Sequence, residues 1–216
     1  MKYLRLFEDF EEYNPYDIMV MFPDERSQRI VQEIQKSEPN LDFIRDLITL
    51  GFDLDWQGTG DYFDSTPLHT AIVYKKAEIV KMLIGAGVDV NWQDKRNGGR
   101  SYMHELAYWG RIDIARILID AGANLDLQDD NGETPLHWAA RHNKMKFTQF
   151  LLDMGANPDI QDKKGWTPLH LALWNNRLKI ARMLIGAGAR TDIQDNEGRL
   201  PYELTDSQLL KNQLKP

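Results

Sequence analysis

Apolar residues recur along the chain in short blocks whose spacing fits one face of a helix. In the block 79–84 the apolar side chains follow the three- and four-residue steps that align side chains along a helix. The same stripe returns in three later blocks, at residues 112–118, 145–151 and 178–184. A glycine follows each block, where a helix can end in a left-handed conformation that only glycine adopts cheaply. The pattern therefore predicts four short amphipathic helices, which end at Gly87, Gly122, Gly155 and Gly188.

A four-residue sequence recurs with the same period and predicts a second helix in each unit. Thr-Pro-Leu-His stands at residues 66–69, 134–137 and 167–170, and weaker copies stand at 101–104 and 200–203. The threonine hydroxyl can cap a helix, and proline fits the first helical turn, where its missing N–H costs nothing. We expect the histidine to tie the turn together by hydrogen bonds to nearby backbone. The copies begin 35, 33, 33 and 33 residues apart, so the chain is a series of repeated units.

These units resemble the ankyrin repeat. The resemblance rests on the Thr-Pro-Leu-His signature, the 33-residue period and the closing Gly-Ala segment, and it covers about residues 26–214. It implies an all-α solenoid of stacked helix-turn-helix units from which β-hairpins project, and a family role in binding other proteins. We expect ankyrin repeats over residues 26–199, with a capping repeat at 26–57 and four repeats after it. Residues 200–216 would form the C-terminal cap.

Residues 1–25 lie outside this pattern and form an acidic leader. They hold seven carboxylates against two basic side chains, a net charge of −5, which leaves −2 for the rest of a chain whose total is −7. Two interpretations of the leader stay open. It covers the apolar edge of the first repeat, or it is an acidic-aromatic docking peptide for a partner.

Composition and charge narrow the possible partners and locations. An acidic leader with a nearly neutral body does not match nucleic-acid phosphates, so we expect no nucleic-acid partner. The sequence has no run of about 18 apolar residues and no apolar secretory segment at its start, so we expect no membrane partner. Cysteine is absent, which removes thiolate chemistry and disulfides and favours a cytoplasmic location. We expect a monomer.

The sequence shows no arrangement typical of an active site. The signature places one histidine in each of four units, at His69, His104, His137 and His170. Packed helical layers lie about 10 Å apart, too far for these side chains to share one metal ion. No phosphate-binding loop, hydrolase elbow or metalloprotease motif occurs. We therefore expect no enzyme, no cofactor and no metal.

The concave contact surface of the ankyrin family lies along the first helices and the hairpin tips. Mapped by motif onto this chain, the helix positions and one tip give Tyr74, Trp109, Arg141, His142, Trp174 and Trp166. The charged tip residues of the expected partner-binding set are Lys95, Arg96, Asp130 and Lys163. Aromatic rings and arginine commonly anchor interfaces. Other readings stay open: the rings pack against the next layer, neighbouring tips pair their charges, and Trp138 faces either the groove or the core.

Together these observations predict a non-catalytic protein–protein interaction scaffold that binds a protein partner on its concave surface. An alternative also stays open. The opening residues MKYLRLFEDF resemble the starts of phage and bacterial reading frames, which suggests an effector-like ankyrin protein that sequesters or inhibits a host protein.

Overall fold

The computed structural model describes residues 23–50, 54, 66–205 and 211, and the chain divides into two compact units. The N-terminal unit covers Met1–Asp89 and the C-terminal unit covers Val90–Pro216. Residues 1–22 of the leader, which the sequence predicts over residues 1–25, and the first tip lie outside the described residues. Helix α2 begins at Pro23, just inside the expected leader, and the division of the chain into repeats stays a prediction.

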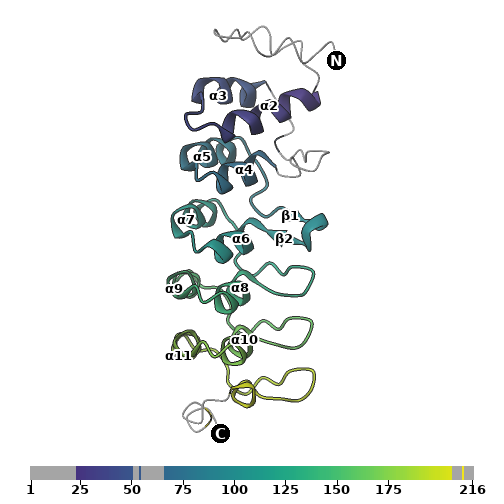
Figure 1. Cartoon of the computed structure of the whole chain (residues 1–216), viewed down its shortest axis with the longest axis vertical. Coiled ribbons are helices and arrows are strands. Elements are labelled where there is room, and N and C mark those ends of the chain that lie inside the picture. Colours follow the sequence, from purple (N-terminus) through teal and green to yellow (C-terminus); the bar gives the residue numbers. More distant parts are fainter. Residues whose placement is uncertain (1–22, 51–53, 55–65, 206–210, 212–216) are drawn as a thin grey trace. The chain divides into compact units, whose positions relative to one another are not determined.

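The described part of the N-terminal unit contains two helical pairs (Figure 1). They are α2 (Pro23–Gln35) with α3 (Leu41–Thr49), and α4 (Pro67–Val73) with α5 (Ala77–Gly85). Helix α2 packs against α3 and α4, and α5 packs against α3 and α4. Ile30, Ile34, Ile44 and Leu47 are fully buried, so the first pair supplies apolar side chains although it lacks the signature.

In its described residues the C-terminal unit repeats the helical pair three times and adds a short 3₁₀ turn. Its elements are β1 (Gln93–Asp94), η2 (Lys95–Asn97), β2 (Arg100–Ser101), α6 (Tyr102–Trp109), α7 (Ile112–Asp120), α8 (Pro135–Arg141), α9 (Met145–Asp153), α10 (Pro168–Trp174), α11 (Leu178–Gly186) and η3 (Pro201–Leu204). Helix α8 packs between α6 and α10, and α10 also packs against η3. Within this unit the first helices form one column, the second helices another, and the loops project on one side (Figure 1). The predicted all-α solenoid is confirmed.

The signature builds the first helix as the sequence predicts. The hydroxyl of Thr66 accepts a hydrogen bond from the backbone N–H of His69, and Pro67 occupies the first helical position. In the later repeats the histidine also reaches back, so that the backbone N–H of Thr134 donates to Nδ1 of His137 at 3.1 Å. Because Nδ1 accepts this bond, the proton lies on Nε2, which donates to the carbonyl of Trp166 at 3.0 Å. One histidine therefore joins its own turn to the next repeat.

Two residues after each of the second helices α5, α7, α9 and α11 stands a glycine in the left-handed region, with φ between 88° and 90° at Gly122, Gly155 and Gly188 and 89° at Gly87. The apolar stripe before these glycines is buried only in part. Ile114 and Leu118 are fully buried, whereas Met145 begins α9 with its side chain exposed. The predicted second helices and the glycines that follow them are confirmed. The buried face of each helix is narrower than the apolar stripe in the sequence.

The tips are joined by main-chain hydrogen bonds. The described residues contain one β-hairpin, in which Gln93 pairs with Ser101 and Asp94 with Arg100, and the later tips are loops without assigned strands. Backbone N–H groups bond from tip to tip: Asp130 to the carbonyl of Gly98 (2.8 Å), Lys163 to Asn131 (2.9 Å) and Asn196 to Lys164 (3.0 Å). The tips of this unit are therefore held in register.

Candidate protein-binding surface

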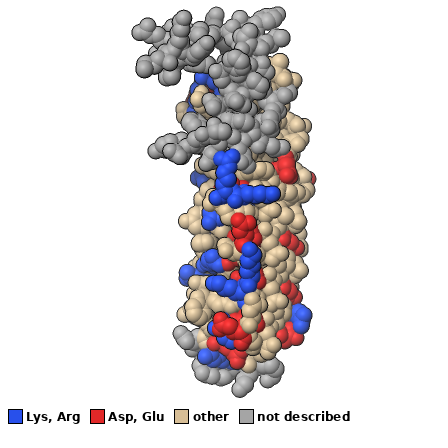
Figure 2. Space-filling model, turned by 90° about the vertical axis from the view of Figure 1, so that its right-hand side faces the viewer, with Lys and Arg blue, Asp and Glu red and all other residues tan. Residues whose placement is uncertain are grey.

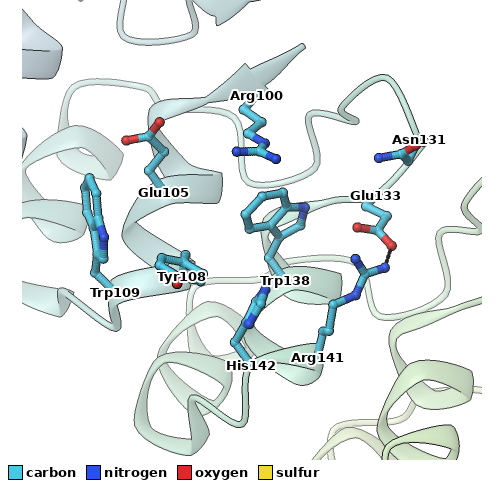
Figure 3. Close-up of a pocket in the computed structure, with 9 residues that line it drawn as sticks. All are labelled: Arg100, Glu105, Tyr108, Trp109, Asn131, Glu133, Trp138, Arg141 and His142. Atoms are coloured by element: carbon cyan, nitrogen blue, oxygen red, sulfur yellow. Dashed lines mark ion pairs between the residues drawn. The ribbon is translucent and has the colours of Figure 1, made fainter. Parts of the chain in front are cut away.

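A pocket of about 450 Å³ opens on the C-terminal unit, between α6, α8 and the loops before them. Figure 3 shows its lining: Arg100, Glu105, Tyr108, Trp109, Asn131, Glu133, Trp138, Arg141 and His142. The lining combines three large aromatic rings with two arginines and two glutamates. Three of these residues, Trp109, Arg141 and His142, belong to the set that the sequence predicts to bind a partner.

Trp138 forms one wall of the pocket. Its side chain is only 8% exposed, and its indole N–H donates to Oδ2 of Asp129 at 3.0 Å. The guanidinium carbon of Arg100 lies 4.6 Å from the ring centroid, within the range of a cation–π contact. Trp138 thus faces both the core and the pocket, which answers the question that its sequence position leaves open.

Arg141 and Glu133 form an ion pair at the edge of the pocket (Figure 3). The Glu133 side chain is 2% exposed, and its Oε2 has no hydrogen-bond partner among the described residues, whereas the Arg141 side chain is 39% exposed. Burial lowers the pKa of Arg141, and the carboxylates of Asp129 and Asp162 oppose this effect. Removal of Arg141 would leave a buried carboxylate without a counter-charge, so this arginine has a structural role besides any contact with a partner.

Tyr108 and His142 lie edge to face, with ring centroids 4.8 Å apart. Tyr108 is 46% exposed, and His142 also packs against Trp138 at 5.7 Å. Partial burial lowers the pKa of His142, and the positive charges of Arg141 and Lys144 lower it further. This wall of the pocket is therefore aromatic, and Arg141 and Lys144 are the cations next to His142.

One residue at the end of each first helix repeats with a step of 33: Tyr108, Arg141 and Trp174. Trp174 is the most exposed large apolar side chain among the described residues, at 59%. It rests against Trp166, with ring centroids 5.5 Å apart. Trp166 itself is buried, because its indole N–H donates to Oδ2 of Asp195 in the next tip at 3.0 Å. Of these two tryptophans, Trp174 offers the larger contact area and Trp166 supports it.

The predicted tip residues are exposed and alternate in sign. Figure 2 shows basic and acidic groups following one another on the side where the tips project. Lys95 and Arg96 belong to the hairpin tip, Asp130 to the next tip and Lys163 to the one after it. Within the described part of the chain neither Asp130 nor Lys163 forms an ion pair, and main-chain bonds join their tips instead. Their charges remain available to a partner.

Tyr74 belongs to the N-terminal unit, at the C-terminal end of α4, and its side chain is 45% exposed. The two units are separate compact bodies, so the placement of Tyr74 bears on the N-terminal unit alone. Its role in binding stays a prediction.

Arg100 and Glu133 line the pocket but do not belong to the partner-binding set that the sequence predicts. A signal for them exists in the repeat. Arg100, Glu133, Trp166 and Arg199 stand immediately before the four-residue signature, 33 residues apart. The last three of these residues accept a hydrogen bond from a signature histidine through their carbonyls, which fixes the position of each. The side chain at this position therefore varies on a fixed backbone.

Two general features of the described residues bear on the class of protein. None of the helices in the ranges that the structure covers has the length and apolarity needed to cross a membrane. In the same ranges no three histidine, aspartate or glutamate side chains come together as metal ligands would.

The stacked helical pairs and their signature define a repeat protein of the ankyrin class, and comparison with known families agrees. The family model for ankyrin repeats (3 copies) matches residues 33–129 and 119–195, which is more than half of the chain. The chain belongs to the ankyrin-repeat family.

Several curated proteins are similar to this chain over part of its length. Inversin of the dog is 31% identical over 120 residues, which is 55% of this chain and 11% of the relative. The neurogenic locus Notch protein of Drosophila melanogaster is 33% identical over 112 residues, 51% of this chain and 4% of the relative. Protein phosphatase 1 regulatory subunit 12A of the mouse is 36% identical over 69 residues, 32% of this chain and 6% of the relative.

The chain thus matches a small part of each of these much longer relatives. Ankyrin repeats are in general a non-catalytic module for protein interaction, and the relatives include proteins named as regulators. These findings support a role in protein interaction.

Proposed function

We propose that the C-terminal unit binds a segment of another protein along the exposed ends of α6, α8 and α10. The observation that carries this proposal is the 59% exposure of Trp174, the largest among the large apolar side chains of the described residues. Tryptophan is highly buried on average, so an exposed ring at this position is notable. Tyr108 stands at the same helix position two repeats earlier and is also exposed, at 46%. Exposed aromatic rings that recur at one helix position are typical of an interface, because they bury large area with little loss of side-chain entropy.

The surroundings of these rings fit the polar rim of an interface. The exposed tip residues Lys95, Asp130 and Lys163 flank the helices of this unit and alternate in charge. Exposed charges contribute little to stability, and at an interface they mainly set the approach and register of a partner. The proposed surface is therefore an aromatic row bordered by charges, without a catalytic role.

The proposal is tested by comparing what the chain and two variants retain from a lysate in quantitative affinity capture. Trp174→Ala should remove at least one protein that the unchanged chain retains, and melting should change little because the side chain is mostly exposed. Met145→Ala is the matched control, since Met145 is an exposed apolar residue on a second helix, at 39%.

The control variant should retain the same proteins as the unchanged chain. Equal retention by Trp174→Ala and by the unchanged chain would show that the aromatic row is not the binding surface. A large fall in melting temperature for Trp174→Ala would show that its ring belongs to the folded core.

A further inference from the structure

Arg100 carries a positive charge for which the described residues provide no acceptor. Within the ranges that the structure covers, its guanidinium makes no ion pair and donates no hydrogen bond. Its backbone is fixed, because Arg100 pairs with Asp94 in the hairpin. Its guanidinium carbon lies 4.6 Å from the centroid of the Trp138 ring, and its end points towards that ring in the lining of the pocket (Figure 3). A guanidinium presents its N–H groups as a planar fork that matches a carboxylate.

Among the described residues, no carboxylate forms an ion pair with Arg100. Glu133 is paired with Arg141. Asp129 accepts hydrogen bonds from the backbone N–H groups of Asn131 (2.8 Å) and Glu133 (3.0 Å) and from the indole of Trp138. Glu105 also lines the pocket, and no ion pair joins it to Arg100 (Figure 3).

A cationic group from a partner would meet three cations here, and of the two glutamates that line the pocket, Glu133 is already paired with Arg141. Arg100 already covers the Trp138 ring, Arg141 lies at the edge, and Lys144 approaches the ring of Tyr108 at 6.0 Å. Partial burial lowers the pKa of His142, and the positive charges of Arg141 and Lys144 disfavour its protonation further. The same repulsion would act on an incoming lysine or arginine.

We propose that this pocket receives an acidic side chain, aspartate or glutamate, of the bound segment, with its carboxylate on Arg100 and an adjacent apolar side chain on Tyr108. The inference rests on the proposed function and assigns the chemistry of one contact within it. The pocket, at about 450 Å³, is large enough for one acidic side chain and its neighbour. Partial burial and an aromatic wall strengthen such a contact relative to one in open water.

The test uses the whole chain, immobilised, and a displayed library of random dodecapeptides as the probe. The retained peptides should share aspartate or glutamate at one position, next to an apolar residue. For the best peptide, replacing that acid by its amide should weaken binding about tenfold. In Arg100→Gln the acidic peptide and its amide should bind equally, because the guanidinium that distinguishes them is gone.

Arg116→Gln is the matched control. Arg116 also lies over an aromatic ring, with its guanidinium carbon 5.0 Å from the centroid of Phe150, but it stands on α7 and does not line the pocket. This variant should keep the full difference between acid and amide. Melting curves of both variants show whether each is folded.

The remaining outcomes would overturn either the acidic contact alone or the proposed binding surface as well. Retained peptides that carry lysine, arginine or no common charge would overturn the acidic contact, as would an acid–amide difference that persists in Arg100→Gln. If peptides bind, depend on Trp174 and lack the acid, the inference alone fails. If no peptide is retained, or if all bind Trp174→Ala unchanged, the proposed surface fails and the acidic contact fails with it.

Discussion

Protonation of the buried signature histidines should destabilise the fold in mild acid, and His137 gives the sharpest case. Its ring is fully buried, Nδ1 accepts the backbone N–H of Thr134, and Nε2–H donates to the carbonyl of Trp166. Both nitrogens are therefore satisfied only in the neutral ring. Burial lowers the pKa of His137 from 6.5 to about 4, and its hydrogen bond to Trp166 only partly opposes this. His104 has the same arrangement and a pKa lowered by burial to about 4.

The lowered pKa decides in which direction the free energy of unfolding changes with pH. The unfolded chain takes up protons below about pH 6.5, and the folded chain does so only near pH 4. The stabilisation that the neutral ring provides is therefore complete above pH 6.5 and is lost as the pH falls through 6.5 towards 4. With these values, each histidine costs about 2.5 kcal/mol of unfolding free energy between pH 7.5 and 4.5. This is a large share of a typical stability of about 5–15 kcal/mol.

The assay is urea unfolding at the two pH values, for the unchanged chain and for His137→Gln. The variant lacks one titrating ring, so its loss of stability on acidification should be smaller by about 2.5 kcal/mol, whatever the carboxylates contribute to both. His142→Asn is the control, because that ring is only part-buried and lies outside the ladder of signature histidines. It should keep most of the pH dependence.

An NMR titration of the histidine ring protons checks the same point without a substitution. The His137 signal should stay that of a neutral ring down to about pH 5 in the folded protein. A midpoint near 6.5 for His137 in the folded chain, or an unchanged pH dependence in His137→Gln, would show that the buried hydrogen bonds do not hold the ring neutral.

Three further predictions concern the tips, the aromatic residues and the leader. Gly132→Ala should destabilise the chain more than Gly98→Ala in thermal unfolding: both have positive φ, 79° and 74°, but a Cβ at Gly132 would lie 2.9 Å from a backbone nitrogen of the next tip. Trp138→Ala should cost about 3 kcal/mol in denaturant unfolding, because the ring is buried and bonded, whereas Trp174→Ala should cost under about 1 kcal/mol. Similar costs would contradict their assignment to core and surface. Deletion of residues 1–22 should lower the melting temperature if the leader covers the first repeat, and unchanged melting with weaker partner capture would favour docking.

The local parts of this fold follow from the sequence because each depends on residues a few positions apart. The cap, the proline and the histidine of the signature act within one turn, and the terminal glycine acts at one position, so their spacing suffices to predict them. Contacts between repeats are harder to derive. Trp166 is a plausible surface ring until Asp195, 29 residues later, provides the acceptor that buries it. The side-chain amides of Gln93, Gln128 and Gln161 likewise donate to the backbone carbonyl of the next glutamine in the series. The signature residues give no sign of this ladder.

The pocket shows why the chemistry of the surface is the least predictable part. The residue before the signature is held through its backbone, by the hairpin at Arg100 and by a histidine bond to the carbonyl at Glu133 and Trp166. The three side chains nevertheless make different contacts. Glu133 finds Arg141 in its own repeat, and Trp166 finds Asp195 in the next. Arg100 finds a ring and no acceptor within the described residues. The repeat period fixes the backbone position of these side chains. Whether a side chain finds a hydrogen-bond or ion-pair partner depends on which residues lie next to it in the same repeat or the next one. A position that the scaffold holds fixed and the fold leaves unsatisfied is therefore where a partner can contribute the missing group.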